Sequence, residues 1–130
     1  MKKKGFTLIE LMVVILIVGI LAAASIPLMR GRIDSAKWSE ANAMAGTIKS
    51  AERVYYVENG SVLTGTVSTN ATALGFDTDD LTGTYFDAGD FSVAGTDGTD
   101  IVITVTSDGS GKMPAAGSYQ LEADGDWVKQ

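Results

Sequence analysis

Residues 6–29 read FTLIELMVVILIVGILAAASIPLM, and this stretch decides the fold of the chain. Three lysines and Gly5 precede it, and charge returns after it at Arg30 and Arg32. As an α-helix, these 24 residues extend about 36 Å at about 1.5 Å per residue, which is enough to cross the hydrocarbon core of a bilayer. The sequence therefore predicts a membrane-spanning helix near the N-terminus.

One acidic residue, Glu10, lies inside the apolar stretch close to its start. A carboxylate placed in hydrocarbon costs roughly 2.5–3.5 kcal/mol, so such a residue indicates a function. Cleavage between Gly5 and Phe6 would create an α-amino group four residues before Glu10, one helical turn away. The carboxylate would then pair with the amine of its own chain or of a neighbouring chain. Alternatively, Glu10 lies at the headgroup level and reaches water, and the spacing alone leaves both interpretations open.

A secretory signal peptide is a second interpretation of this stretch. The small residues at positions 22–25 resemble a signal-peptidase site, and the lysines resemble a basic start. The apolar run is longer than the usual core of a signal peptide, however, and Glu10 lies inside it. Both features favour a retained helix.

The string KKGFTLIELMVV (residues 3–14), continuing to GILAAASIP (residues 19–27), resembles the N-terminal methylation motif of type IV pilins. The pseudopilins of type II secretion systems share this motif. The resemblance implies that an inner-membrane prepilin peptidase removes residues 1–5 as a leader and N-methylates Phe6. It also implies that Glu10 pairs with the Phe6 amine of an adjacent subunit during filament assembly, and that the helix loosens between Gly19 and Pro27. Independently, Pro27 predicts a kink or gap because it lacks a backbone N–H.

Residues 30–59 predict an amphipathic continuation of the helix. Apolar residues fall at helical spacing on one face, which we expect to contact the core: Ala41, Met44, Ala45, Ile48, Ala51 and Tyr55. We expect Lys49 on another face, and Trp38 on the side that faces other subunits. Asn59-Gly60 is a typical helix stop. Together with the apolar stretch, this predicts one helix of about 53 residues.

After Gly60 the composition changes sharply, because 28 of the 71 residues from 60 to 130 are Gly, Ser or Thr. We expect a loop over residues 60–90 and an antiparallel sheet of about four strands over residues 91–130. The expected strands are 91–94, 101–106, 118–122 and 126–128. The predicted fold class is therefore α+β: a long N-terminal helix packed on a small antiparallel sheet, as in the pilin fold. The predicted divisions are a leader (1–5), an apolar helix (6–29) and a globular domain (30–130).

The charges are distributed unevenly along the chain. Residues 1–53 carry eight basic and four acidic side chains, whereas residues 54–130 carry two basic and twelve acidic ones. The acidic C-terminal part argues against binding to nucleic acid. The chain has no Cys and no His, which excludes disulfides, thiolate zinc sites and histidine general bases. No nucleophile–base pair or phosphate-binding loop is present, so we expect neither enzymatic activity nor a cofactor.

Acidic turns are weak candidates for calcium ligation, because carboxylates on Gly-rich turns suit that ion. The candidates are Asp97 with Asp100 and Asp124 with Asp126, and beside them Asp77-Thr78-Asp79-Asp80 and Asp87 with Asp90. None of these pairs has the spacing of an EF-hand loop. Asp and Gly are also ordinary turn formers, so we expect no metal site.

The expected function is that of a structural subunit of a type IV pilus. Its expected partners are further copies of itself, the prepilin peptidase and the inner-membrane pilus assembly platform. The chain would lie in the inner membrane before assembly, and afterwards in an extracellular pilus or a periplasm-spanning pseudopilus. The alternatives are a type II secretion pseudopilin, a DNA-uptake pilin and a membrane-anchored periplasmic binding module that never polymerises. Glu10 argues against the binding module, because a simple anchor gains nothing from an acid at that position.

Overall fold

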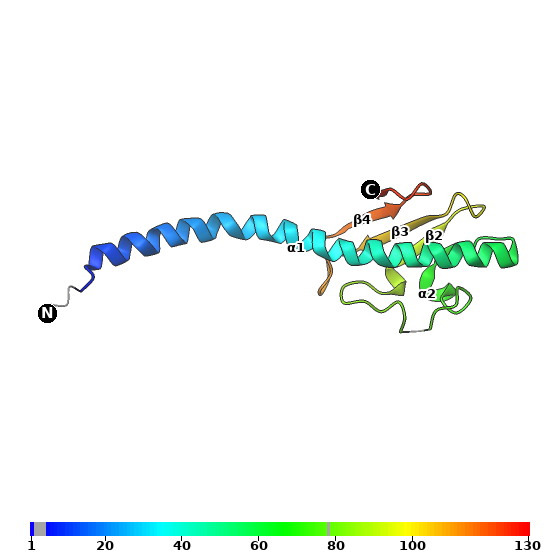
Figure 1. Cartoon of the computed structure of the whole chain (residues 1–130), viewed down its shortest axis with the longest axis horizontal. Coiled ribbons are helices and arrows are strands. Elements are labelled where there is room, and N and C mark those ends of the chain that lie inside the picture. Colours follow the sequence, from blue (N-terminus) through cyan, green and yellow to red (C-terminus); the bar gives the residue numbers. More distant parts are fainter. Residues whose placement is uncertain (2–4, 78) are drawn as a thin grey trace. The chain divides into compact units, whose positions relative to one another are not determined.

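A computed structural model describes residue 1, residues 5–77 and residues 79–130, so that Lys2, Lys3, Lys4 and Thr78 lie outside the described residues. The chain forms two compact units, residues 1–33 and residues 34–130. Helix α1 (Leu8–Asn59) contributes its first part to the N-terminal unit and the rest to the second, globular unit (Figure 1). The predicted long N-terminal helix is confirmed, and it has 52 residues.

Helix α1 ends at the Asn59-Gly60 pair for a stereochemical reason. Gly60 has a φ of +72°, in the left-handed region that glycine adopts without a steric penalty. Its N–H donates to the carbonyl oxygen of Tyr56 at 2.7 Å, and the Asn59 side-chain amide donates to the Tyr55 carbonyl oxygen at 3.0 Å. These bonds satisfy two of the last carbonyls of the helix, and the chain then turns back along the globular unit.

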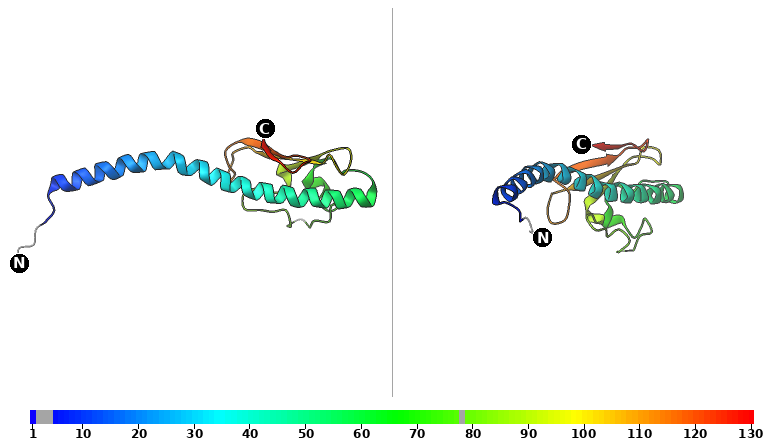
Figure 2. Two further views of the ribbon diagram at one scale, coloured as in Figure 1. Left: turned by 45° about the horizontal axis from the view of Figure 1, so that its top comes forward. Right: turned by 60° about the vertical axis from the view of Figure 1, so that its left-hand side comes forward.

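Among the described residues, the globular unit contains one antiparallel sheet of five strands in chain order, β1 to β5. The strands are β1 (Gly65–Thr66), β2 (Phe91–Ala94), β3 (Val102–Ser107), β4 (Gly117–Leu121) and β5 (Trp127–Lys129). The short helices α2 (Val67–Asn70) and η1 (Ala88–Asp90) lie between β1 and β2. Figure 2 shows the sheet along the part of α1 that belongs to this unit.

The predicted α+β fold is confirmed, and the sheet has one strand more than the four that we expected. The additional strand, β1, pairs Gly65 with Val93 and Thr66 with Ser92. A strand of two residues is too short to show the alternation of apolar and polar residues that identifies strands in a sequence. The region expected to be a loop thus contributes one edge of the sheet.

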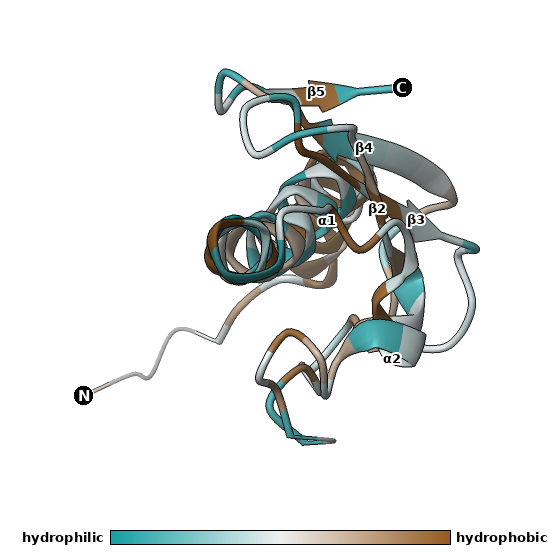
Figure 3. Cartoon of the chain, turned by 90° about the vertical axis from the view of Figure 1, so that its right-hand side faces the viewer, coloured by the Kyte–Doolittle hydropathy of each residue, from teal (hydrophilic) through white to brown (hydrophobic). Residues whose placement is uncertain are grey.

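The core of the globular unit lies between α1 and one face of the sheet. Residues alternate between buried and exposed along β2, and the buried side chains of β2 and β3 include Phe91, Val93, Ile103 and Val105. Figure 3 looks along α1 and shows the sheet beside it. The helix contributes Ala41, Ala45 and Ile48, which are fully buried. The predicted core stripe is therefore confirmed at these three positions, while Met44, Ala51 and Tyr55 are half-buried.

Trp38 also belongs to this core, so the expectation that it faces other subunits is wrong. Its side chain is 8% exposed. Its ring centroid lies 5.1 Å from that of Phe86 and 4.5 Å from that of Tyr119. Trp38 precedes Ala41 by three residues and so continues the buried stripe by one turn. The large aromatic ring fills the space between the helix, β4 and the segment before β2.

Two charged side chains of α1 bind loops of the globular unit. They lie in the first turns that the helix makes within this unit. Glu40 Oε1 accepts hydrogen bonds from the backbone N–H groups of Tyr85 at 2.8 Å and Phe86 at 3.2 Å. Lys37 Nζ donates to the carbonyl oxygen of Met113 at 3.3 Å and lies 5.3 Å from the centroid of the Tyr85 ring. The acid therefore binds backbone donors, and the base binds a backbone acceptor and an aromatic face.

Two further charged side chains of α1, about three and two turns before its end, also bind backbone groups. Lys49, which we expected on an outward face, is 5% exposed, and its Nζ donates to the carbonyl oxygens of Glu122 and Ala123. Burial lowers the pKa of the Lys49 ammonium. Glu52 is fully buried, and its Oε1 accepts a hydrogen bond from the backbone N–H of Leu63.

We expect the Trp38→Ala substitution to lower the free energy of unfolding of the globular unit by about 3–5 kcal/mol, because it leaves a large cavity in the core. The measurement is chemical denaturation of the full chain in detergent, followed by the fluorescence of Trp127. Val57→Ala serves as the control, since Val57 is 83% exposed on the same helix. Equal stability of the two variants would contradict the placement of Trp38 in the core.

Candidate functional site

The large apolar side chains of the N-terminal unit are exposed in the described chain. The most apolar 18-residue window of α1 has a mean hydropathy of 2.8, and none of it is buried. By length and composition α1 is suited to cross a membrane, and it is the one helix of this kind in the described residues. So much exposed apolar surface needs a lipid or protein environment.

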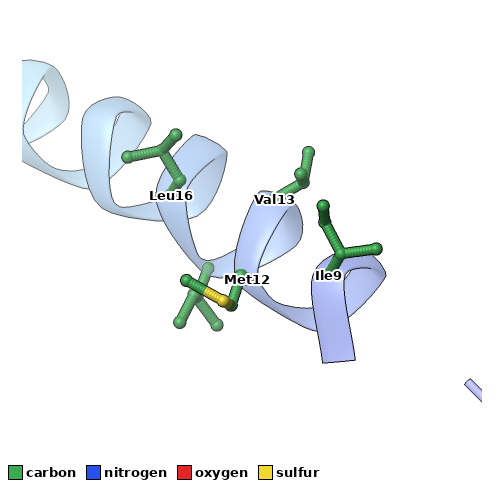
Figure 4. Close-up of a pocket in the computed structure, with 5 residues that line it drawn as sticks. Ile9, Met12, Val13 and Leu16 are labelled. Carbon is green, nitrogen blue, oxygen red and sulfur yellow. The ribbon is translucent and has the colours of Figure 1, made fainter. Parts of the chain in front are cut away.

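The first turns of α1 present a shallow apolar groove on their surface. Figure 4 shows the side chains that line it, which project from successive turns of the helix: Ile9, Met12, Val13, Ile15 and Leu16. These residues fall at spacings of three and four, which places them on neighbouring rows of the helix surface. A groove of this shape and composition suits an acyl chain or another apolar helix.

Thr7 and Glu10 form the N-terminal cap of α1. Glu10 Oε2 accepts hydrogen bonds from the Thr7 backbone N–H at 2.8 Å and from the Thr7 hydroxyl at 2.7 Å. In return, the backbone N–H of Glu10 donates to Thr7 Oγ1 at 3.3 Å. This reciprocal arrangement is a capping box, which satisfies N–H groups that the helix itself leaves unpaired.

Sequence reasoning missed the role of Thr7, although the signal was present. A threonine followed three residues later by glutamate, directly before an apolar run, is the sequence pattern of a capping box. The cap also shows how the Glu10 carboxylate is shared: Oε2 takes both bonds from Thr7, and Oε1 makes no hydrogen bond within the described part of the chain. One carboxylate oxygen therefore stays available to a further donor.

The predicted processing residues lie just before this cap. Phe6 is 93% exposed, and a side chain at Gly5 would meet no atom of the described chain within 4 Å. Both residues precede α1 and are not held by it. Lys2, Lys3 and Lys4 of the predicted leader lie outside the described residues.

Pro27 does not interrupt α1, so the predicted gap in the helix is absent. Proline removes only the hydrogen bond that its own N–H would make to the carbonyl four residues earlier, and the helix continues on both sides. Near it, Ser25 Oγ donates to the Leu21 carbonyl oxygen at 2.8 Å. A side chain at Gly19 would meet no atom within 4 Å, which leaves this position open to close approach by another helix.

The acidic turns of the globular unit bond within themselves. Asp100 Oδ1 accepts from the backbone N–H groups of Thr96 at 2.7 Å and Asp97 at 2.8 Å. Asp124 Oδ1 accepts from the Asp126 N–H at 3.1 Å. Hydrogen bonds from Thr99 lower the pKa of the Asp97 carboxyl. These hydrogen bonds are typical of turns formed by Asp. No cluster of three metal-ligating residues occurs among the residues that the structure describes.

Comparison with known proteins adds two findings. Residues 1–26 match the family model of the prokaryotic N-terminal methylation motif. The chain is 38% identical over 109 residues to the fimbrial protein EcpC of Eikenella corrodens, which covers 84% of this chain and 65% of that protein. It is 52% identical over 58 residues to the type IV major pilin protein PilE1 of Neisseria gonorrhoeae, which covers 45% of this chain.

The other matches are shorter than the match to EcpC. The match to the gonococcal pilin covers 35% of that protein, and a match to a fimbrial protein of Moraxella nonliquefaciens, 51% identical over 49 residues, covers 32% of it. The chain thus spans less than two thirds of these relatives' length. Residues 1–26, which match the family model, contain the cap of α1 and most of its apolar stretch. The chain carries the prokaryotic N-terminal methylation motif and is similar to type IV pilins and fimbrial proteins.

Proposed function

We propose that the chain is a structural subunit of a type IV pilus, inserted in the inner membrane as a prepilin and polymerised through its N-terminal helix. The observation that carries this proposal is the wholly exposed apolar part of α1, which has one acid at its start. In lipid, and later in a filament core, that surface finds the apolar contacts that the chain itself does not provide. The proposed role is structural and not enzymatic.

The proposed maturation step is cleavage between Gly5 and Phe6 by a prepilin peptidase, followed by N-methylation of Phe6. Hydrolysis of that peptide bond gives a free carboxyl group on Gly5 and an amino group on Phe6. The new amine is cationic and lies one residue before the capping Thr7. The cleavage removes Lys2, Lys3 and Lys4, so that the remaining residues carry seven basic and sixteen acidic side chains.

In the proposed assembly step, Glu10 pairs with the Phe6 amine of an adjacent subunit. Its Oε2 caps the subunit's own helix through Thr7, and its Oε1 is the oxygen that receives the neighbouring ammonium. The pairing offsets the cost of a carboxylate in a low-dielectric core. It also sets the register between adjacent helices, because apolar contacts alone do not fix one axial position.

The other proposed partners follow from this route. An inner-membrane assembly platform extracts the subunit from lipid, and the subunit passes from the inner membrane to an extracellular pilus. Gly19 permits close packing between helices at its position, because it carries no side chain that would keep the two backbones apart. Pro27 lacks one backbone N–H and so marks the place where α1 can loosen most easily.

We expect Glu10→Ala to insert into the membrane normally and to lower filament assembly at least tenfold. The measurement is membrane fractionation combined with electron microscopy of sheared surface filaments. Two further variants separate the roles of the carboxylate. Glu10→Gln keeps an oxygen that can accept from Thr7 but has no charge, so it should also fail to assemble.

Thr7→Ala removes the hydroxyl part of the cap and keeps the charge of Glu10, so it should assemble much better than Glu10→Gln. Normal filaments from Glu10→Gln would show that the charge is not needed. Equal defects in Thr7→Ala and Glu10→Gln would assign Glu10 to capping alone.

We expect a bulky substitution at Gly5, such as Gly5→Leu, to leave the leader uncleaved, because the peptidase must approach the backbone on both sides of the bond. Mass spectrometry of the N-terminus would then show the full-length, unmethylated chain. Gly5→Ala is the matched control and should be cleaved to a larger extent. A mature N-terminus at Phe6 in Gly5→Leu would contradict the proposed cleavage position.

A further inference from the structure

Glu52 is an ionisable group that the assembly of subunits does not use. Its side chain is fully buried in the globular unit, on the turn of α1 that follows Lys49. Oε1 accepts the backbone N–H of Leu63, while Oε2 is buried and has no hydrogen-bond partner among the described residues. An ionised carboxylate in this position would be paired with a single neutral donor.

The neighbouring basic residues do not neutralise Glu52. Lys49 lies three residues earlier on α1, but its Nζ is bonded to the carbonyl oxygens of Glu122 and Ala123. Arg53 is exposed. No salt bridge to Glu52 exists within the described residues. Burial raises the pKa of its carboxyl, and the hydrogen bond from the Leu63 N–H opposes that rise.

The other titratable groups of the globular unit include Tyr55 and Tyr56 of α1 and two acids of the turn before β3, Asp97 and Asp100. Tyr56 lies against that turn, since a side chain on Gly98 would come within 2.7 Å of Tyr56 Cδ1. Hydrogen bonds within the turn lower the pKa of both Asp97 and Asp100, so these acids are already ionised where Glu52 titrates. Residues 60–64, which join α1 to β1, contain no ionisable side chain.

We propose that Glu52 is a proton-operated latch: in its neutral acid form it holds residues 60–64 against α1, and its ionisation releases them. The neutral acid is tolerated in the interior and accepts from Leu63. The ionised carboxylate is not tolerated there, because only one of its two oxygens accepts a hydrogen bond and its hydrogen bonds to water are lost. Opening of residues 60–64 would return the charge to water.

The direction of the pH dependence follows from the difference between the closed and open states. Burial raises the pKa of Glu52 above its ordinary value of 4.5, and the Leu63 N–H opposes that effect only in part. The closed state therefore holds its proton more tightly than the open state. The closed state is most stable at a pH below 4.5, the ordinary pKa of Glu52. It loses stability as the pH rises towards the raised pKa, and above the raised pKa its stability no longer changes with pH. This latch lies in the globular unit and does not depend on filament assembly.

The test is hydrogen–deuterium exchange of the full chain in phospholipid nanodiscs between pH 4 and pH 8, with each rate divided by the intrinsic rate at that pH. In the wild type, we expect the protection of peptides that cover Leu63 to fall by up to tenfold per pH unit over part of this range, while that of β3 stays unchanged. In Glu52→Gln, which keeps an acceptor for Leu63 but does not titrate, the protection should not depend on pH. Asp100→Asn is the matched control and should behave as the wild type does.

Protection at Leu63 that is independent of pH in the wild type would overturn the proposal, as would a pH dependence that survives in Glu52→Gln. Infrared spectroscopy provides a second measurement that does not require Glu52→Gln to fold. It is made in the Asp90→Asn background, because burial also raises the pKa of Asp90. A carboxylic-acid band that disappears at the pH where Leu63 loses protection supports the latch, and the absence of such a band throughout this range overturns it.

Discussion

The globular unit depends on one recurring interaction, in which charged side chains of α1 bind backbone groups of the segments that wrap around the helix. Buried backbone N–H and C=O groups need partners, and a sheet of short strands leaves many of them unpaired at its connections. Glu40 and Glu52 bind N–H groups, whereas Lys37 and Lys49 bind carbonyl oxygens. The helix thus provides an apolar stripe for the core and, beside it, the hydrogen-bond partners of the irregular segments.

The same helix carries two carboxylates in different surroundings. Glu10 lies at the start of α1 and is exposed, and it accepts from the N–H and hydroxyl of a capping threonine; its other oxygen is the one that the proposed pairing with a neighbouring chain would use. Glu52 lies near the end of α1 and is enclosed by its own chain, with one oxygen unsatisfied. An exposed carboxylate can bind a cation of another chain, whereas a buried carboxyl makes the stability of the fold depend on pH.

The sequence was sufficient to predict the class of fold and the N-terminal helix. The apolar run, Gly60 and the alternation in strands such as Phe91–Ala94 are local signals, and each corresponds to an observed element. The capping role of Thr7 was also encoded locally, in its spacing from Glu10. The predicted cleavage between Gly5 and Phe6 and the pairing of Glu10 stay predictions, since they concern a peptidase and a second subunit.

The positions of Trp38, Lys49 and Glu52 could not be predicted, because their burial depends on segments that are distant in sequence. Lys49 is covered by a turn that lies 73 residues later in the sequence, and no local sequence pattern around Lys49 predicts that contact. Helical periodicity assigned charged residues to the solvent, which is usually correct. Here the wrapping segments extend beyond the apolar stripe and cover charged positions beside it. The two-residue strand β1 was missed for a related reason, since only its partner β2 makes it a strand.

The strand order of the sheet has a consequence for the time course of folding. Every strand pairs with the strands just before and after it in the chain, so each hairpin is able to form as soon as it is synthesised. The contacts between helix and sheet are delayed, because the partners of Lys49 lie in the turn between β4 and β5. During synthesis from the N-terminus, α1 is complete long before that turn exists. The hydrogen bonds of Lys49 therefore form only after the turn between β4 and β5 has been synthesised, and until then this position on the helix is open to solvent.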